Sequence, residues 1–401
     1  MKNLTVLGST GSIGTSTLDV VRRRQDCAIF ALVAGHNTGL LASQILEFRP
    51  RLAVVATEDG RANLTDQLYA LGMARADWPQ LEYGPEARVR AAAAPEANFV
   101  MSAIVGIAGL AATYEAVRLG KTVGLANKEV LVSSGRLVTQ AARASGAELI
   151  PVDSEHNGVH QCLRAGERGE VARVLLTASG GPFRQTPVEE LAAVTPAQAL
   201  NHPTWKMGPR ITIDCATMMN KGFEVIEACW LFDLPPAEVG VVIHPQSSVH
   251  AMVEYTDGSL IAQISATDMR MPIQYALTYP AREPAPVARM DWTVPRRFDF
   301  EPPDLGKFPL LNLAYQAQET GGSAGCTLNA ADEIAVEAFL AGRITYPGIA
   351  GVVEHTLSQV PVSEPCSIEE VLQTDEESRS VARAFVARRA GADVVGPLVR
   401  A

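Results

Sequence analysis

The chain has no long apolar run, no clustered cysteines and no basic cluster, and each absence excludes a class of protein. No apolar stretch approaches the ~18 residues of a membrane span, and a strand expected from about residue 3 argues against a signal peptide. The six cysteines lack CxxC or metal-type spacing, as is usual in a reducing cytosol. A formal net charge of −10 argues against a nucleic-acid partner. We therefore expect a soluble cytoplasmic protein that binds neither membranes nor nucleic acids.

The first 150 residues alternate strand and helix patterns. A length of 401 residues exceeds one ordinary domain, so two or three domains are expected. Such alternation is typical of a doubly wound, Rossmann-like parallel sheet in an α/β fold. The expected strands lie near 2–7, 29–33, 52–56, 98–101, 122–125 and 147–152.

A glycine-rich turn, Gly8-Ser9-Thr10-Gly11-Ser12-Ile13-Gly14, joins the strand Lys2–Leu7 to a helix expected over Ser16–Arg24. In doubly wound sheets this turn places a dinucleotide pyrophosphate at a helix N-terminus. The alternative is a turn that only connects strand and helix. A P-loop is excluded because no Gly-Lys-Ser/Thr follows.

The second strand ends without an acidic residue. Ile29–Val33 runs into Ala34-Gly35-His36-Asn37, whereas an NAD site usually carries Asp or Glu there to bind the ribose 2′-hydroxyl. His36 and Asn37 could instead donate to a 2′-phosphate. This favours NADP, although His36 could equally be a solvated loop residue.

The pattern changes after residue 150. Residues 151–280 carry strand candidates near 171–177, 239–243, 248–255 and 260–265, and Asp257-Gly258 between the last two is a hairpin signal. This pattern predicts an antiparallel or mixed sheet, one face of which could be free for a partner subunit. The proline-rich segment 281–309 is expected to be an extended linker. Helical spacing follows within 310–401, at 310–320, 328–341, 346–358 and 376–390, and predicts a C-terminal helical domain.

Two acidic residues, Asp153 and Glu155, follow the expected strand at 147–152. In an extended chain residues i and i+2 point to the same side, so the two carboxylates would meet and would need a cation or proton between them. Alternatively, they could cap the helix that follows. The residues alone do not decide between a cation site and a cap.

A third carboxylate lies in Asn220-Lys221-Gly222-Phe223-Glu224. At spacings of i and i+4, Asn220 and Glu224 share a helix face, with Lys221 beside them. Three carboxylates with an amide and an ammonium would suit a divalent metal and an anionic, oxygen-rich substrate, and oxygen ligands favour Mg²⁺ or Mn²⁺ over zinc. The alternative is a surface Lys-Glu pair of little energetic value.

Two loops complete the candidate site. Thr177-Ala178-Ser179-Gly180-Gly181-Pro182 offers a hydroxyl and backbone N–H groups that could surround an anion. The polar loop Asn201–Gly208 carries Trp205 and would suit a lid that expels water. Taken alone, Trp205 fits a packing residue better.

In combination these stretches resemble the 1-deoxy-D-xylulose 5-phosphate reductoisomerase family. The matching motifs are GSTGSIG (8–14), LANKE (125–129), PVDSEHN (151–157), SGGPF (179–183), HPTWKMG (202–208), ATMMNKGFE (216–224), IHPQS (243–247) and LNAADE (328–333). The resemblance implies a homodimer that rearranges 1-deoxy-D-xylulose 5-phosphate and reduces the product with NADPH to 2-C-methyl-D-erythritol 4-phosphate, in isoprenoid precursor synthesis. It also implies Mg²⁺ or Mn²⁺ held by Asp153, Glu155 and Glu224, which serve in catalysis with Lys128 and Lys221.

The resemblance further implies which residues contact the substrate and which contact the cofactor. Substrate contacts are Lys128, Ser154, Glu155, Ser179, His202, Trp205, Met207, Cys215, Asn220, Lys221 and Glu224. Cofactor contacts are Thr10, Gly11, Ser12, Ile13, Gly35, His36, Asn37, Ala103, Asn127, Glu129 and Gly208. Two positions depart from the family: His36 replaces a common Lys or Arg, and Cys215 replaces a serine that donates to the substrate phosphate.

Two other functions compete with this interpretation. A semialdehyde or acyl-phosphate reductase shares the glycine-rich opening but would need Cys162 or Cys215 as a nucleophile and would retain activity in EDTA. An NADP-sensing regulatory protein would have no use for the acidic constellation around Glu224.

Overall fold

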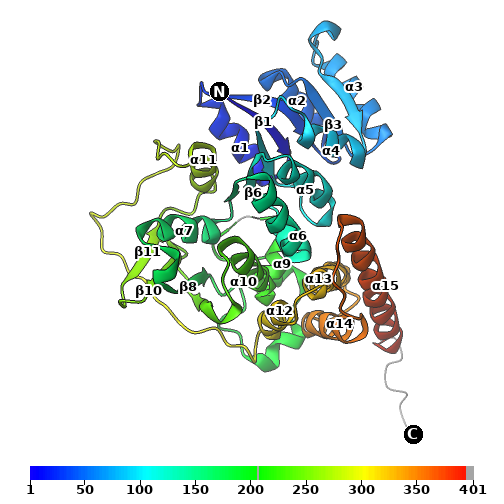
Figure 1. The fold of residues 1–401 in the computed structure, drawn as a ribbon. Coiled ribbons are helices and arrows are strands. Elements are labelled where there is room, and N and C mark those ends of the chain that lie inside the picture. Colours follow the sequence, from blue (N-terminus) through cyan, green and yellow to red (C-terminus); the bar gives the residue numbers. More distant parts are fainter. Residues whose placement is uncertain (206, 394–401) are drawn as a thin grey trace. The chain divides into compact units, whose positions relative to one another are not determined.

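The computed structural model describes residues 1–205 and 207–393, which form two compact units (Figure 1). The first unit contains residues 1–130, 136–157 and 268–290. The second contains 131–135, 158–267 and the described residues from 291 onward. Helices α6 (Glu129–Ser145) and α7 (Ser154–Cys162) contribute residues to both units.

A seven-stranded parallel sheet forms the centre of the first unit, which confirms the doubly wound prediction. Its order is β4-β3-β2-β1-β5-β6-β7. The strands are β1 (Lys2–Leu7), β2 (Cys27–Val33), β3 (Leu52–Val55), β4 (Gln80–Tyr83), β5 (Phe99–Ser102), β6 (Thr122–Leu125) and β7 (Leu149–Pro151). The sequence analysis missed β4, because this short edge strand has no buried residue and therefore no hydrophobic pattern.

Helices cover this sheet, and the core between them is buried. The helices are α1 (Ser12–Arg22), α2 (Thr38–Phe48), α3 (Glu58–Ala70), α4 (Pro85–Ala93), α5 (Leu110–Arg118), part of α6, and α11 (Arg270–Thr278). The buried core includes Leu4, Leu32, Leu41 and Phe99. The predicted start of the first helix at Ser16 is wrong: α1 begins at Ser12, inside the glycine turn. Gly14 therefore lies in the helix, where its missing side chain lets the backbone approach the turn closely.

The second unit contains a four-stranded mixed sheet in the order β11-β10-β8-β9, as predicted. Its strands are β8 (Val171–Ala178), β9 (Val239–Ile243), β10 (Val249–Tyr255) and β11 (Leu260–Ile264). β8 pairs in parallel with β9, whereas β10 is antiparallel to both β8 and β11. The predicted hairpin joins β10 to β11, and Gly258 at its tip has a φ of +85° that favours glycine.

The helices after residue 308 share a hydrophobic core with α9 (Pro209–Thr217) and α10 (Met219–Phe232). The remaining helices are α8 (Pro196–Ala199), α12 (Pro309–Thr320), α13 (Ala324–Leu340), α14 (Tyr346–Gln359) and α15 (Ile368–Asp393). Short 3₁₀ helices occur at Arg75–Asp77, Ile107–Gly109, Leu163–Ala165, Arg168–Glu170, Val188–Ala193 and Pro236–Glu238. The predicted terminal helices exist, but α13 and α15 begin earlier than expected. Ser367 explains the second case, because its Oγ accepts the amide N–H of Glu370 at 3.3 Å and caps α15.

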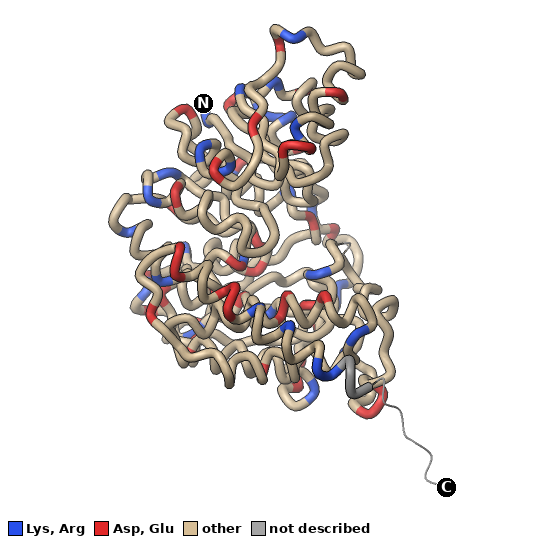
Figure 2. Tube along the Cα trace, turned by 90° about the vertical axis from the view of Figure 1, so that its right-hand side faces the viewer, with Lys and Arg blue, Asp and Glu red and all other residues tan. Residues whose placement is uncertain are grey.

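The proline-rich segment after α11 is held by contacts rather than by regular structure. A single bridge joins Glu301 to Ile243 at the end of β9, and the His244 ring stacks on Phe300 with centroids 4.8 Å apart. Acidic and basic residues are interspersed along the chain (Figure 2). Among the described residues, no helix combines the length and apolarity needed to cross a membrane.

Candidate active site

The glycine turn is packed so tightly that two of its glycines cannot be replaced. Gly8 has a φ of +89°, and a Cβ there would lie 2.4 Å from the carbonyl oxygen of Ala103. A Cβ on Gly14 would lie 2.2 Å from the carbonyl oxygen of Gly8. No side chain caps α1 at Gly11. The first turn of α1 is therefore not closed by a cap, and its N–H groups suit a phosphate.

The loop after β2 is exposed and contains no carboxylate. The Oδ1 atom of Asn37 accepts the amide N–H of Leu40 at 3.1 Å and caps α2. The Nδ2 group of Asn37 is the side-chain donor that this residue can offer to a ligand. His36 beside it is exposed.

Asn127 is 2% exposed and binds backbone groups on two sides. Its Nδ2 donates to the carbonyl oxygens of Ile104 and, at 3.0 Å, of Gly106, and its Oδ1 accepts the amide N–H of Val130 at 3.1 Å. Asn127 thus holds the loop after β5 beside Ala103. Its predicted direct contact with the cofactor stays a prediction.

The pair Asp153 and Glu155 does not lie in an extended segment, so that part of the sequence reasoning is wrong. α7 begins at Ser154 and places Glu155 in its first turn, because helix formation starts directly after β7. The two carboxylates nevertheless offer oxygens within 4.8 Å of each other. Lys128, 8% exposed, donates from Nζ to Asp153 Oδ2, and the Ser154 hydroxyl donates to Glu155 Oε2 at 2.5 Å. Asp153 Oδ1 also accepts the amide N–H of Ser154 at 3.1 Å, so a local turn bond accompanies the carboxylate pair.

The predicted shared face on α10 is confirmed, and it is buried rather than on the surface. Asn220 Nδ2 donates to Glu224 Oε1 at 2.7 Å, and Lys221 Nζ donates to Glu224 Oε2. The side chains of Lys221 and Glu224 are only 3% and 1% exposed. Burying such a pair costs desolvation energy that a surface pair does not cost, so stability alone is a weak reason for its presence.

Ser179 and His202 meet in the second unit, as the sequence analysis expected of residues around one phosphate. His202 Nδ1 accepts the amide N–H groups of Thr204 at 3.1 Å and Trp205 at 2.9 Å. Burial lowers the pKa of His202, so the ring is neutral at neutral pH and carries its proton on Nε2. Nε2 lies 3.1 Å from Ser179 Oγ and donates to it.

The Ser179 hydroxyl is therefore set up as a donor. Its oxygen accepts from His202 and from the amide N–H of Gly181 at 3.2 Å, which leaves its own proton to be given away. Gly181 has a φ of +66°, and a Cβ there would lie 2.6 Å from the carbonyl oxygen of Cys215. This close approach brings the turn after β8 against the last turn of α9.

The described residues of the loop Asn201–Gly208 form neither helix nor strand, and the loop joins α9 at Gly208. Trp205 and Met207 are half-buried. Lys206, part of the matching motif, lies outside the described residues.

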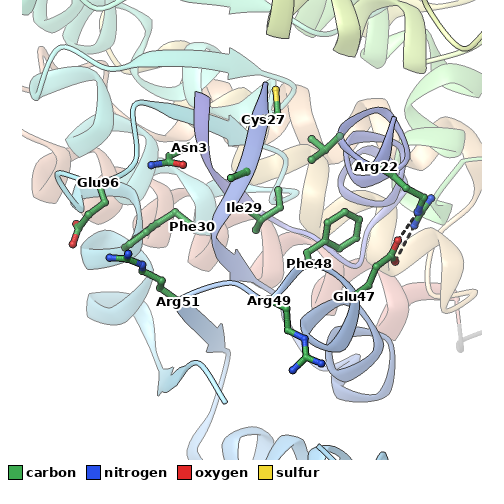
Figure 3. A pocket seen from close by; sticks show the side chains of 12 residues that line it. Asn3, Arg22, Cys27, Ile29, Phe30, Glu47, Phe48, Arg49, Arg51 and Glu96 are labelled. Atoms are coloured by element: carbon green, nitrogen blue, oxygen red, sulfur yellow. Dashed lines mark hydrogen bonds and ion pairs between the residues drawn. The ribbon is translucent and has the colours of Figure 1, made fainter. Parts of the chain in front are cut away.

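A hollow of about 750 Å³ in the first unit is not the nucleotide site. It is lined by Asn3 and Cys27 near the starts of β1 and β2 and by Arg49 and Arg51 (Figure 3). The glycine turn lies at the opposite, carboxyl end of β1, where ligands bind in such sheets.

Models of one family match most of the chain. The model described as 1-deoxy-D-xylulose 5-phosphate reductoisomerase matches residues 4–135, and two models of its C-terminal domains match 149–232 and 264–381. A protein of that name from Solibacter usitatus is 66% identical over 395 residues, covering 98% of this chain and all of the relative.

Two solved structures are similar along nearly their whole length. The Zymomonas mobilis 1-deoxy-D-xylulose 5-phosphate reductoisomerase in complex with NADPH has a TM-score of 0.89 and 44% identity, covering 96% of this chain and 99% of that one. A DOX-P reductoisomerase in complex with NADPH, fosmidomycin and magnesium has a TM-score of 0.90 and 38% identity, covering 99% of this chain and all of that one. The glycine turn, the buried α10 carboxylate and these matches lead to one conclusion: the chain belongs to the 1-deoxy-D-xylulose 5-phosphate reductoisomerase family.

Proposed function

We propose that this protein rearranges 1-deoxy-D-xylulose 5-phosphate and reduces the product with NADPH to 2-C-methyl-D-erythritol 4-phosphate. The observation that carries the proposal is Glu224, a fully buried carboxylate held between Lys221 and Asn220. A thioester mechanism or a sensor has no use for such a group. The relatives of the same length and the NADPH and magnesium complexes of similar proteins support this proposal.

The carboxylates Asp153, Glu155 and Glu224 would hold Mg²⁺ or Mn²⁺. All three donors are carboxylate oxygens, the ligands that these hard cations prefer, and the first two already lie close to each other. When bound, the ion supplies Lewis-acid stabilisation of negative charge on the substrate oxygens. Lys128 and Lys221 add positive charge beside Asp153 and Glu224.

The substrate phosphate would be held by groups of the second unit. Ser179 donates its hydroxyl proton, His202 fixes the orientation of that hydroxyl, and Asn220 and Lys221 contribute further donors. Cys215 on α9 lies next to the Ser179 turn through its carbonyl group. Trp205 and Met207 would cover the bound substrate, and Ser154 would contact its hydroxyl groups beside Lys128.

The cofactor would lie along the carboxyl end of the first sheet. The pyrophosphate would be bound by backbone N–H groups at the N-terminus of α1, in the segment that contains Thr10, Gly11, Ser12 and Ile13. Further contacts are proposed for Gly35, His36, Asn37, Ala103, Asn127, Glu129 and Gly208.

We also propose a homodimer in the cytoplasm. β11 is an edge strand whose Leu260, Ile261 and Ile264 are 48%, 37% and 37% exposed. An apolar edge of this kind invites pairing with a second copy of the sheet. All six cysteines lie in the described residues and none is paired with another in a disulfide, as suits a reducing compartment.

The test of the function is NADPH oxidation, followed through the loss of the nicotinamide absorption, with purified protein and 1-deoxy-D-xylulose 5-phosphate. Turnover is expected with Mg²⁺ or Mn²⁺ and none after EDTA treatment. Activity that survives EDTA and is lost on thiol alkylation would instead favour the thioester mechanism.

A preference for NADPH over NADH is expected, and His36→Asp should reduce it. A carboxylate at position 36 would repel the 2′-phosphate of NADPH and could accept a hydrogen bond from the 2′-hydroxyl of NADH. At this exposed position the repulsion is worth roughly 1 kcal/mol, so the ratio of the kcat/KM values should shift by about fivefold to tenfold. His36→Asn, which adds no charge, is the control. Equal use of both cofactors by the unaltered protein would refute the prediction.

Cys215→Ser should lower KM for the phosphorylated substrate, because a hydroxyl is a stronger donor than a thiol. One hydrogen bond contributes at most ~1.5 kcal/mol, so the gain is limited to about tenfold. The turnover number should change little if the phosphate is held equally before and during reaction. Cys366→Ser, at an exposed cysteine, is the control. An unchanged or raised KM, with alkylation of Cys215 not slowed by substrate, would show that Cys215 only fills an apolar pocket.

A further inference from the structure

A buried network of charged side chains joins three helices of the second unit, α9, α13 and α15. Arg210 on α9 donates to Glu333 Oε1 at 2.5 Å and to Asn329 Oδ1 at 2.8 Å on α13. Arg379 on α15 donates to Glu333 Oε2 at 2.7 Å and to Asp375 at 2.5 and 3.1 Å. The network thus links the start of α9 to the terminal helices.

Asp332 is the member that these bonds leave out. Its side chain is 0% exposed, and the nearest guanidinium nitrogen, Arg210 Nη2, lies 3.9 Å from its Oδ2, beyond hydrogen-bond distance. Among the described residues, neither oxygen of Asp332 receives a bond from a donor group. What lies within hydrogen-bond reach is a second carboxyl group, that of Asp214 on α9.

The burial of Asp332 requires a retained proton. If Asp332 were ionised, its charge would lie 3.9 Å from the guanidinium group of Arg210, without a hydrogen bond from any donor among the described residues. Such a buried charge is costly. Two ionised carboxylates also cannot form a hydrogen bond with each other, because each can only accept one. A protonated carboxyl group can donate a hydrogen bond to an ionised one.

The proton belongs on Asp332 rather than on its neighbours. Burial first, and then the charge of Asp214, raise the pKa of Asp332 well above its ordinary value. Burial acts on Glu333 as well, but Arg210 and Arg379 together outweigh it and lower the pKa of that group. Burial also raises the pKa of Asp375. Two hydrogen bonds from Arg379 oppose this rise, because they favour the ionised form of Asp375.

The location of this pair connects it to the reaction. Asp214 lies one residue before Cys215 on α9, and α9 begins at Pro209, directly after the loop Asn201–Gly208. Tyr346 of α14 donates to the carbonyl oxygen of Ala216 at 2.6 Å and braces the end of the same helix. The bond between Asp332 and Asp214 therefore acts on a helix that carries one candidate phosphate contact and continues directly from the candidate lid.

We propose that Asp332 keeps its proton and donates a hydrogen bond to Asp214. We also propose that this bond positions α9, and with it Cys215 and the described residues of the loop Asn201–Gly208, for binding of the substrate phosphate. Asp332 is a positioning residue: it touches neither substrate nor cofactor. The inference rests on the proposed function for the phosphate, but the protonation itself does not.

The first experiment detects the proton directly. The carbonyl stretching band of a protonated carboxyl group is expected in the infrared spectrum of the full-length protein at neutral pH, and absent in Asp332→Asn. Asp375→Asn is the matched variant, because it removes another buried acid of the same network and should retain the band. A missing band, or a band that disappears in Asp375→Asn instead, would overturn the proposal. No substrate is used, so failure of the proposed function would not affect this result.

Stability against pH is the second measurement. A carboxyl group whose pKa is raised by folding contributes stability that is fully present below the unfolded pKa of about 4. That contribution is lost progressively as pH rises toward the folded value. Asp332→Asn should therefore reduce the pH dependence of the free energy of unfolding by up to one proton above pH ~4. If Asp332→Asn left the slope unchanged, the assignment of the proton would be wrong.

The positioning role is tested by comparing Asp332→Asn with Asp332→Leu. The amide still donates to Asp214, so Asp332→Asn should leave KM for 1-deoxy-D-xylulose 5-phosphate and the kcat unchanged. Leu cannot donate, so Asp332→Leu should raise that KM about tenfold with a smaller change in kcat and an unchanged KM for NADPH. Trypsin should also cut faster within 201–208 in Asp332→Leu, a readout that needs no turnover. If Asp332→Leu matched the unaltered protein in cleavage and KM, or if Asp332→Asn behaved like Asp332→Leu, the positioning role would be wrong.

Discussion

Glu224→Gln is expected to lower kcat by at least about a hundredfold and to weaken binding of Mg²⁺ and Mn²⁺. The amide keeps the shape of the side chain, so Asn220 can still donate to the Oε1 position. What is lost is the negative charge that a divalent cation requires of a ligand. Lys221 also loses its ionic partner in a buried place, which should reduce the free energy of unfolding.

The two effects of this substitution can be separated. Metal affinity and kcat should be measured below the unfolding transition of the variant, which circular dichroism locates. Glu238→Gln is the control, because Glu238 is a partly exposed carboxylate of the second unit that pairs with Arg168 at 3.2 Å. It should retain most of the turnover and the metal affinity. Normal activity and metal affinity in Glu224→Gln would remove this residue from the metal site.

The parts of the fold that could be predicted are those set by short-range hydrophobic pattern. The buried strands Leu4–Leu7 and Val174–Ala178 and the apolar faces of α12 to α14 carry their own signals, and all were found. β4 was missed because it is short and unburied. The start of α1 was misplaced because Gly14 disfavours a helix by intrinsic propensity, whereas tertiary packing against Gly8 and Ser9 decides the matter.

In the candidate site, too, features set within one helix could be predicted, whereas features set by tertiary packing could not. The spacing of Asn220 and Glu224 predicted their shared face, because a helix fixes that geometry locally. The environment of the pair could not be predicted, since burial depends on the helices that pack around α10. Likewise, no spacing connects Asp214 with Asp332, which are 118 positions apart in the sequence (332 − 214) and meet only when α9 packs against α13.

Gly14→Ala is expected to abolish most NADPH binding, with a Kd raised at least about a hundredfold. In an ordinary helix this exchange stabilises by roughly 1 kcal/mol, because alanine is the better helix former. Here the added Cβ would lie 2.2 Å from the carbonyl oxygen of Gly8 and 2.5 Å from the Cα of Ser9. Both are backbone atoms that cannot rotate away, so the turn itself must open. Steric repulsion at these distances outweighs the gain in propensity.

Opening the turn moves the N–H groups of α1 away from the pyrophosphate, so binding should suffer more than stability does. Gly39→Ala is the matched control: Gly39 also lies in the first turn of a helix, α2, but a Cβ there would meet nothing within 4 Å. That variant should bind NADPH normally and be as stable as the unaltered protein or slightly more so. Isothermal calorimetry gives both Kd values, and thermal unfolding gives both stabilities. If Gly14→Ala bound NADPH as Gly39→Ala does, the turn could not be the pyrophosphate site, because a displaced α1 cannot present the same N–H groups.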